Sequence, residues 1–219
     1  MFCIRLLSVS QMGEYESLTG MEKYISSLRA ERISHFRTSQ DKILCLFVEL
    51  VIRYDIIRTL SLRNDEISFY YNRFGKPLFL YNGIPFCFSV SHCDEIIAYV
   101  HHTNACGIDV EKLQCGMKDV SDRYFTEDES LYINQNSYSD RRFTEIWTRK
   151  EAYLKMKGTG LNMPLDSFSV LDETLSDRII TFREGAYFVS LCSENTLSER
   201  IEIIRMNPDE IIDFFSNSL

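Results

Sequence analysis

The amino-acid sequence predicts an α+β fold made of two similar halves, residues 1–104 and 105–219. Each half runs in the same order, with a strand first, then helix, then a set of strands, although no repeat is visible at the level of residue identity. The 219 residues are 45% hydrophobic, enough apolar material for one large domain or two small ones. No linker rich in Pro, Gly or Ser separates the halves near 101–106, so we expect them to pack closely.

The first half begins with FCIRLLSV, which we expect to form a strand, and a helical segment follows through about 29–37. Its clearest helix is 39–60, with Ser39 as the candidate N-cap, because the apolar residues there recur with a period of 3.6. Turn residues then separate short β-rich runs, which are ISFYY, PLFLY, FCFSV and IIAYVH.

The second half starts with a predicted strand, ACGIDVE, and passes through helical segments at about 127–135 and 140–157. Further β-like runs complete it, which are SFSVL, RIITF, AYFVSLC and IEIIR. The two halves therefore alternate strands and helices in a way that favours two layered units meeting side by side.

Charge and cysteine content exclude several classes of protein. The formal net charge of −8 disfavours nucleic acid and anionic membranes as partners of the whole molecule. No uncharged stretch approaches the roughly 18 residues of a membrane helix, and the start does not resemble a signal peptide, so we expect a cytoplasmic protein. Seven cysteines without a CxxC pair indicate neither a disulfide framework nor a structural zinc site.

An acidic pair lies in the segment GIDVEK. Asp109 and Glu111 are two apart on a predicted strand, so both side chains project from one face and can share a cation. Mg²⁺ takes carboxylate oxygens, often only one or two from the protein together with substrate phosphates. The alternative for an isolated pair of this kind is a solvated strand end.

A third acid, Glu151, lies on the helix predicted at 140–157. Trp147, Glu151 and Lys155 share one face of that helix, and an exposed Glu–Lys pair beside a core tryptophan would also explain this spacing. That explanation leaves a concentration of cations unexplained in an acidic chain: Arg141, Arg142, Arg149, Lys150, Lys155 and Lys157. The glycines of KGTGL end the helix and do not form a Walker loop, because they follow the helix instead of opening one.

Together, GIDVEK, WTRKEAYLKMKGTGL and PLDSFSV resemble the 4′-phosphopantetheinyl transferases. They resemble in particular the two-half bacterial type, like the enzymes that activate surfactin synthetase in secondary metabolism. The pattern GxDxE followed by WxxKExxxKxxGxGL is specific as a combination, and the resemblance extends over most of the chain, from about residue 29 to 170. It implies two pseudo-twofold-related α+β halves with a cleft between them.

Other segments fit the same resemblance. RFGKPLF resembles the family's GKP segment, with Lys76 in place of a basic residue that contacts coenzyme A, and FSVSHCDE resembles its serine–histidine motif, with Ser91 and His92. In LRAERISHFR, Arg29 and Arg32 occupy positions that hold the 3′-phosphate of the ribose. Two positions depart from the family: Leu44 stands where a basic residue is common, and Ser89 where asparagine is common.

The resemblance implies Mg²⁺-dependent transfer of the 4′-phosphopantetheine arm of coenzyme A to a serine of an apo acyl, polyketide or peptidyl carrier protein, releasing 3′,5′-ADP. Asp109, Glu111 and Glu151 would then hold the metal. Coenzyme A would be bound by a wider set, which is Arg29, Arg32, Lys76, Ser91, His92 and Lys155. Glu151, Lys155 and His92 would be the catalytic residues, with Glu151 as the candidate general base.

Two alternatives remain from the sequence. One is another Mg²⁺-dependent phosphotransferase or nuclease with the same acids; the other is a non-catalytic module that binds coenzyme A or a carrier protein. We expect a monomer, because two complete halves in one chain can supply a whole cleft. A carrier-binding surface between the halves would use Phe125 and its neighbours in RYFTEDE together with part of the basic helix 141–157, unless Phe125 is a core aromatic.

Overall fold

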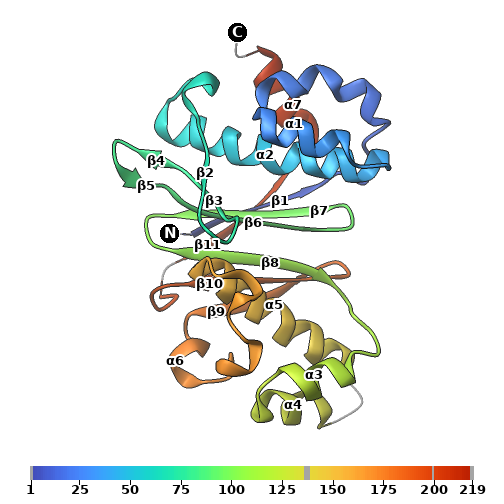
Figure 1. The fold of residues 1–219 in the computed structure, drawn as a ribbon, viewed down its shortest axis with the longest axis vertical. Helices are drawn as coiled ribbons and strands as arrows, with labels where there is room; N and C mark the ends of the chain where they lie inside the picture. Colours follow the sequence, from blue (N-terminus) through green and yellow to red (C-terminus); the bar gives the residue numbers. More distant parts are fainter. Residues whose placement is uncertain (1, 136–138, 199, 218–219) are drawn as a thin grey trace.

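The computed structural model describes residues 2–135, 139–198 and 200–217. Two sheets are stacked between two layers of helices, with α1, α2 and α7 on one side and α5 with α3 and α4 on the other (Figure 1). The α+β class predicted from the sequence is therefore confirmed. Within the described ranges, no helix is both long enough and apolar enough to cross a membrane.

The first sheet has four strands in the order β11-β1-β7-β6. Their bounds are β1 Phe2–Ser8, β6 Cys87–Cys93, β7 Ile96–His102 and β11 Ile201–Met206. β1 pairs antiparallel with β7 and parallel with β11, which comes from the end of the chain. The helix that follows β11, α7 (Pro208–Asn217), packs in the same hydrophobic core as this sheet and α2. The division at 104/105 stays a prediction, and the described end of the chain returns to the first sheet.

The long helix α2 (Ser39–Leu60) begins and ends where its backbone is capped. Thr38, and not the predicted Ser39, is the N-cap: its side chain accepts from the Asp41 amide at 3.1 Å. Ser61 ends the helix with φ 55°. Most of the helix is buried, because the sheet, α7, α1 (Ser27–Ser34) and the 3₁₀ helix η1 (Tyr15–Tyr24) enclose it.

Short elements connect α2 to β6. They are η2 Asn64–Glu66, β2 Tyr70–Tyr71, β3 Pro77–Leu78, β4 Leu80–Tyr81 and β5 Ile84–Pro85. β2 pairs with β3 and β4 pairs with β5, each pair antiparallel and only two residues long. The β-rich runs predicted in this region, ISFYY and PLFLY, are therefore confirmed only in part: Tyr70–Tyr71, Pro77–Leu78 and Leu80–Tyr81 are strands, in two small hairpins outside the main sheets.

The second sheet is antiparallel, in the order β8-β10-β9, with β8 Cys106–Lys112, β9 Ile179–Glu184 and β10 Tyr187–Ser193. One face packs on the first sheet through an apolar cluster that includes Ile4, Val100, Ile108 and Leu191. Helices lie on the other side, namely α3 Lys118–Tyr124, α4 Glu127–Asn134, α5 Ser139–Lys157 and α6 Glu173–Ser176. The sequence predicted α4 and α5 but neither α3 nor α7.

The expected strand SFSVL is wrong. Two short 3₁₀ helices, η3 (Gly160–Asn162) and η4 (Leu165–Ser167), occupy this part of the chain; the first residue of SFSVL, Ser167, ends η4, and none of its residues belongs to a strand. Side chains bind this backbone instead: Lys150 Nζ donates to the carbonyl oxygens of Leu165 and Phe168 at 2.6 and 2.7 Å. The Val170 amide donates to Glu129 at 2.8 Å, so buried charges replace a neighbouring strand as hydrogen-bond partners.

Candidate active site

Helix α5 lies directly against strand β8 at Gly107. A Cβ atom at this position would come within 2.0 Å of the Ala152 backbone oxygen and 2.4 Å of the Met156 amide nitrogen. Only a residue without a side chain allows the strand and the helix to approach so closely. The glycine of GIDVEK therefore brings the strand that carries two acids next to the helix that carries the third.

Six of the predicted residues line one cleft of about 360 Å³ beside this contact. They come from three elements: Ser91 and His92 from β6, Asp109 and Glu111 from β8, and Glu151 and Lys155 from α5. Val90 and Trp147 complete the lining. The cleft thus unites segments that are far apart in the sequence.

Asp109 lies at the buried base of this cleft. Its Oδ1 accepts hydrogen bonds from Ser91 Oγ at 2.8 Å and from Lys155 Nζ at 2.7 Å. Lys155 Nζ also donates to Ser91 Oγ at 2.6 Å, which closes a triangle of three polar groups. The other carboxylate oxygen, Oδ2, is buried and has no hydrogen-bond partner among the described residues. A buried anionic oxygen without a donor is costly, so this atom is available for a ligand.

Burial and the negative charge of Asp109 disfavour the ionised form of both glutamates of the cleft. Burial and then the charge of Asp109 raise the pKa of Glu111, and the same two causes raise the pKa of Glu151. Trp147 Nε1 and Gln114 Nε2 donate to Glu111, each at 3.4 Å, and offset part of this effect. Three carboxylates in one cleft would be stabilised by an additional cation.

The donor set of this cleft fits a hard divalent cation such as Mg²⁺. Carboxylate oxygens are the ligands that Mg²⁺ prefers, and Asp109 Oδ2 is an oxygen without a partner in the structure. As the side chains stand, however, the described residues contain no group of three His, Cys, Asp or Glu close enough to form a metal centre. The ammonium of Lys155 binds Asp109 at present. The metal role of Asp109, Glu111 and Glu151 therefore stays a prediction.

His92 lies among cations. Enclosure by the protein and the charges of Lys155, Arg29 and Arg32 lower the pKa of its imidazole, although the side chain keeps contact with solvent. Arg29 and Arg32 do not line the cleft itself, but they are near enough to influence His92 electrostatically. The neutral ring can donate one N–H to an anion, and the surrounding positive charge favours an anionic ligand.

Arg29 is fixed by a buried carboxylate that the sequence did not reveal. Its Nε donates to Glu49 at 3.3 Å, and Glu49 also accepts from Arg53 at 2.8 Å and from the Ser26 amide at 2.6 Å. An acid in the middle of the apolar pattern of α2 was the available signal. Leu44 lies on the same helix, at the position where the family has a basic residue, and its side chain is buried in the hydrophobic core.

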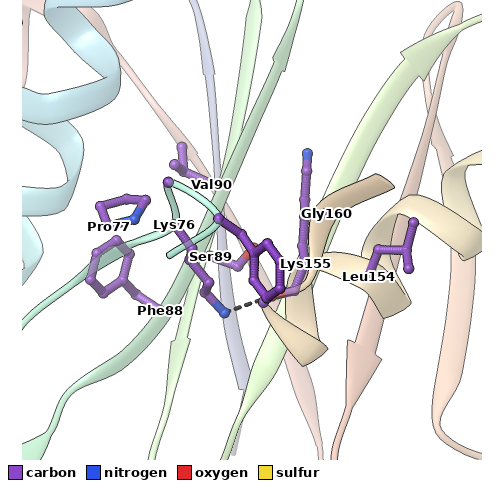
Figure 2. Close-up of a pocket in the computed structure, with 11 residues that line it drawn as sticks. Lys76, Pro77, Phe88, Ser89, Val90, Leu154, Lys155 and Gly160 are labelled. Carbon is purple, nitrogen blue, oxygen red and sulfur yellow. Dashed lines mark hydrogen bonds between the residues drawn. The ribbon is translucent and has the colours of Figure 1, made fainter. Parts of the chain in front are cut away.

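Lys76 lies in an adjoining cavity of about 240 Å³ that shares Val90 and Lys155 with the cleft. Figure 2 shows its side chain reaching α5, where Nζ donates to the Lys155 carbonyl oxygen at 2.6 Å. Burial lowers the pKa of the Lys76 ammonium. Lys76 thus lines the cavity, and its ammonium already has a hydrogen-bond acceptor in the backbone of α5.

Three further residues of the sequence analysis lie outside this cleft. Lys150 belongs to the predicted cation cluster, yet it is fully buried and pairs with the equally buried Glu129 at 2.7 Å. Phe125 is a core aromatic with 6% of its surface exposed, stacked on Phe143 and near Trp147, so the predicted role in carrier binding is wrong. Ser89, the second family departure, joins β6 to β8 by accepting from the Ile108 amide at 3.0 Å.

Comparison with known proteins gives a consistent result. Residues 105–204 match the sequence model of the 4′-phosphopantetheinyl transferase superfamily. The chain is 25% identical over 208 residues to the 4′-phosphopantetheinyl transferase gsp of Aneurinibacillus migulanus, covering 89% of this chain and 86% of that protein. It is 31% identical over 149 residues to a 4′-phosphopantetheinyl transferase of Bacillus subtilis, covering 67% and 66%. The Sfp protein of Bacillus subtilis strain 168 is 29% identical over 150 residues, with 67% and 66% covered.

Proposed function

The chain belongs to the 4′-phosphopantetheinyl transferase superfamily, and we propose that it transfers the 4′-phosphopantetheine arm of coenzyme A to a serine of an apo carrier protein, with release of 3′,5′-ADP. The observation that carries this proposal is the cleft itself. It combines three carboxylates, one with a buried oxygen that lacks a donor, with a lysine and a histidine at hydrogen-bonding positions. Such a set suits a pyrophosphate together with a divalent cation.

In this proposal Asp109, Glu111 and Glu151 would hold Mg²⁺. When bound, the ion supplies positive charge that neutralises the pyrophosphate and the leaving phosphate. Support comes from the partnerless oxygen of Asp109 and from the raised pKa of both glutamates, because a cation would relieve their mutual repulsion. Magnesium dependence is part of the proposal.

The protein's own cations and hydroxyl would bind the phosphates. Lys155, already within 2.7 Å of Asp109, would donate to the pyrophosphate oxygens together with His92 and Ser91. Arg29 and Arg32 would take the 3′-phosphate, since their charges already act on His92 beside the cleft. Catalysis would then consist largely of alignment and charge neutralisation.

Glu151 would accept the proton of the attacking serine. A bond forms between the serine oxygen and the β-phosphorus, the bond from that phosphorus to 3′,5′-ADP breaks, and the serine proton passes to the Glu151 carboxylate. Burial and neighbouring acids raise the pKa of Glu151, which makes its carboxylate a stronger base. Its place beside both other acids in the cleft supports this assignment.

The carrier protein would bind next to α5. A groove there is lined by Tyr124, Leu161 and Met163 and shares Trp147 with the cleft. Tyr124 and Leu161 are half or more exposed, so they offer apolar contact at the mouth of the site. Because the chain is acidic overall, docking of an acidic carrier would depend on this local surface. We further propose that the protein is a cytoplasmic monomer and that it serves secondary metabolism.

Intact-protein mass spectrometry tests the reaction. A panel of apo acyl, polyketide and peptidyl carrier proteins would be incubated with the protein, coenzyme A and Mg²⁺, and each carrier would have a matched variant with its acceptor serine changed to alanine. We expect a mass gain of one phosphopantetheine arm on at least one carrier, none on its alanine variant and none after EDTA. Coenzyme A binding without any gain would instead favour a binding module, and phosphate release without a carrier would favour another phosphotransferase.

A further inference from the structure

The turn at residues 72–76, between β2 and β3, is organised by one side chain. Asn72 Oδ1 accepts from the backbone amides of Phe74 at 2.9 Å and Lys76 at 3.0 Å. The Gly75 amide donates to the Asn72 carbonyl at 3.0 Å, with Gly75 at φ 84°. An asparagine that bonds to amides two and four residues ahead fixes the shape of such a turn.

The same side chain also reaches the end of helix α5. Asn72 Nδ2 donates to the carbonyl oxygen of Gly158 at 2.7 Å, where α5 ends with φ 70°. Lys76 Nζ donates to the carbonyl oxygen of Lys155 one turn earlier (Figure 2). The last carbonyls of a helix lack partners within the helix, and here Lys76 binds the carbonyl of Lys155 in the last turn of α5, while Asn72 binds that of Gly158 directly after it.

The approach leaves little room for a side chain at the helix end. A Cβ atom at Gly158 would lie 3.2 Å from Asn72 Nδ2 and 3.3 Å from Lys76 Cδ. The positive φ of Gly158 points the same way, since other residues adopt it at a cost. The 72–76 turn therefore packs closely against the end of α5.

This contact is linked to the cleft through Lys155. The carbonyl of Lys155 is held by Lys76, while its ammonium binds Ser91 and Asp109. The turn and the helix end also form facing parts of the adjoining cavity, with Phe74, Gly75 and Lys76 on one part and Leu154 and Gly158 on the other. A change in the contact would move the cavity wall and the backbone that carries Lys155.

We propose that Asn72 is a positioning residue for coenzyme A binding, which joins the 72–76 turn to the end of α5 and so sets the cavity wall and the place of Lys155. The inference rests on the proposed function. Asn72 touches neither the acids of the cleft nor its lining residues directly, because its hydrogen bonds go to the turn and to Gly158. It acts through the backbone of the helix end.

Substitution of Asn72 by aspartate separates its two roles. Asn72→Asp keeps an oxygen that accepts from the Phe74 and Lys76 amides, but it loses the donor to Gly158 and places negative charge beside that carbonyl. Asn72→Ala removes both roles. Asn162→Ala is the matched control, because Asn162 ends the short helix η3 after α5, is exposed, and among the described hydrogen bonds donates to the nearby Thr159 carbonyl at 3.3 Å.

The experiment measures KM for coenzyme A, KM for the carrier, kcat, the Kd of coenzyme A by calorimetry, and Tm for each variant. We expect Asn72→Asp to raise both KM and Kd for coenzyme A about tenfold, the typical effect of losing one such hydrogen bond near a bound anion. KM for the carrier should stay within about twofold of the wild type, and Asn162→Ala should match the wild type.

A purely structural role predicts a different pattern. If Asn72→Asp lowers Tm and kcat but leaves KM and Kd for coenzyme A unchanged, or raises KM for both substrates equally, the positioning role is wrong. Failure of the wild type to modify any carrier would count against the proposed function instead. The calorimetric Kd then still tests Asn72, because it needs no transfer.

Discussion

The backbone oxygen of Ala152 in α5 would lie 2.0 Å from a Cβ atom placed on Gly107 in β8. No side chain separates strand and helix at this point, so their backbones are in van der Waals contact. Asp109 lies two residues further along the strand, and Glu151 precedes Ala152 on the helix. The close approach of Gly107 and Ala152 therefore sets how far Asp109 lies from Glu151, although neither acid takes part in that contact.

Replacement of Gly107 by alanine tests this dependence. The added methyl group must push α5 away from β8, and overpacking of this kind costs about 1–3 kcal/mol of unfolding free energy. We expect urea unfolding to show that loss and transfer activity to fall with it, because the acids separate. Gly13→Ala is the control, since a Cβ atom there meets no atom within 4 Å. Equal stability of both variants would contradict the close contact.

Removal of Lys150 should weaken the fold more than removal of its exposed neighbour Lys157. Lys150→Met leaves Glu129 buried without its cation and deprives two loop carbonyls of a donor, a loss of about 3–5 kcal/mol. Lys157→Met, on the same helix, removes an exposed charge and should change stability by less than about 0.5 kcal/mol. Chemical denaturation compares the two, and similar values would exclude a structural role for the Lys150–Glu129 pair.

Mg²⁺ should stabilise the folded protein, and Glu151 should be needed for it. A ligand at ten times its Kd adds about 1.4 kcal/mol, which corresponds to a Tm rise of a few degrees for a chain of this size. Glu151→Gln should raise Tm without the metal, since it removes one of three repelling carboxylates, and should abolish the rise with it. Glu145→Gln, which affects a partly buried pair with Arg149 outside the cleft, should respond to Mg²⁺ like the wild type.

The pH dependence of that stabilisation has a defined sign. The pKa values of Glu111 and Glu151 are raised in the folded protein, so both bind protons at a higher pH than in the unfolded chain. Protons therefore compete with Mg²⁺ as the pH falls, and the rise in Tm should shrink on acidification. A rise in Tm that grows on acidification would contradict a carboxylate site.

His92 should titrate below the ordinary histidine value near 6.5. Enclosure and three nearby cations oppose its protonation, so the unfolded chain takes up this proton at a higher pH. The contribution of His92 to stability is then full above about pH 6.5 and is lost as the pH falls towards the folded pKa. An NMR titration assigned with His92→Gln measures this. Coenzyme A should raise the midpoint, and a midpoint at or above 6.5 in the free protein would be inconsistent with the cation cluster.

The sequence predicted the site better than its surroundings. Spacing alone placed Asp109 and Glu111 on one face of a strand, and periodicity placed Glu151 with Lys155 on one face of a helix; the cleft contains all four. Lys150 is adjacent to Glu151 in the sequence but lies about 100° around the helix, which points it into the core. Charge density could not reveal which cations face inwards.

Contacts between distant segments had no signal in the sequence. Asn72 reads as an ordinary turn residue, and nothing in its neighbourhood indicates a bond to Gly158, 86 positions away. The strand expected at SFSVL failed for a related reason, because its partners are the side chains of Lys150 and Glu129 and not another strand. The return of β11 to the first sheet is likewise a matter of tertiary pairing.

The most direct test of the central claim compares the wild type with Glu151→Gln and Glu145→Gln in one transfer assay. Carrier mass gain and 3′,5′-ADP release would be followed together, with the Kd of coenzyme A measured in parallel. For the wild type and for Glu145→Gln we predict that one 3′,5′-ADP is released for each carrier modified. For Glu151→Gln we predict a fall in kcat of at least about 100-fold, while coenzyme A still binds. Near-normal turnover by Glu151→Gln, or no product from the wild type with any carrier, would contradict the account.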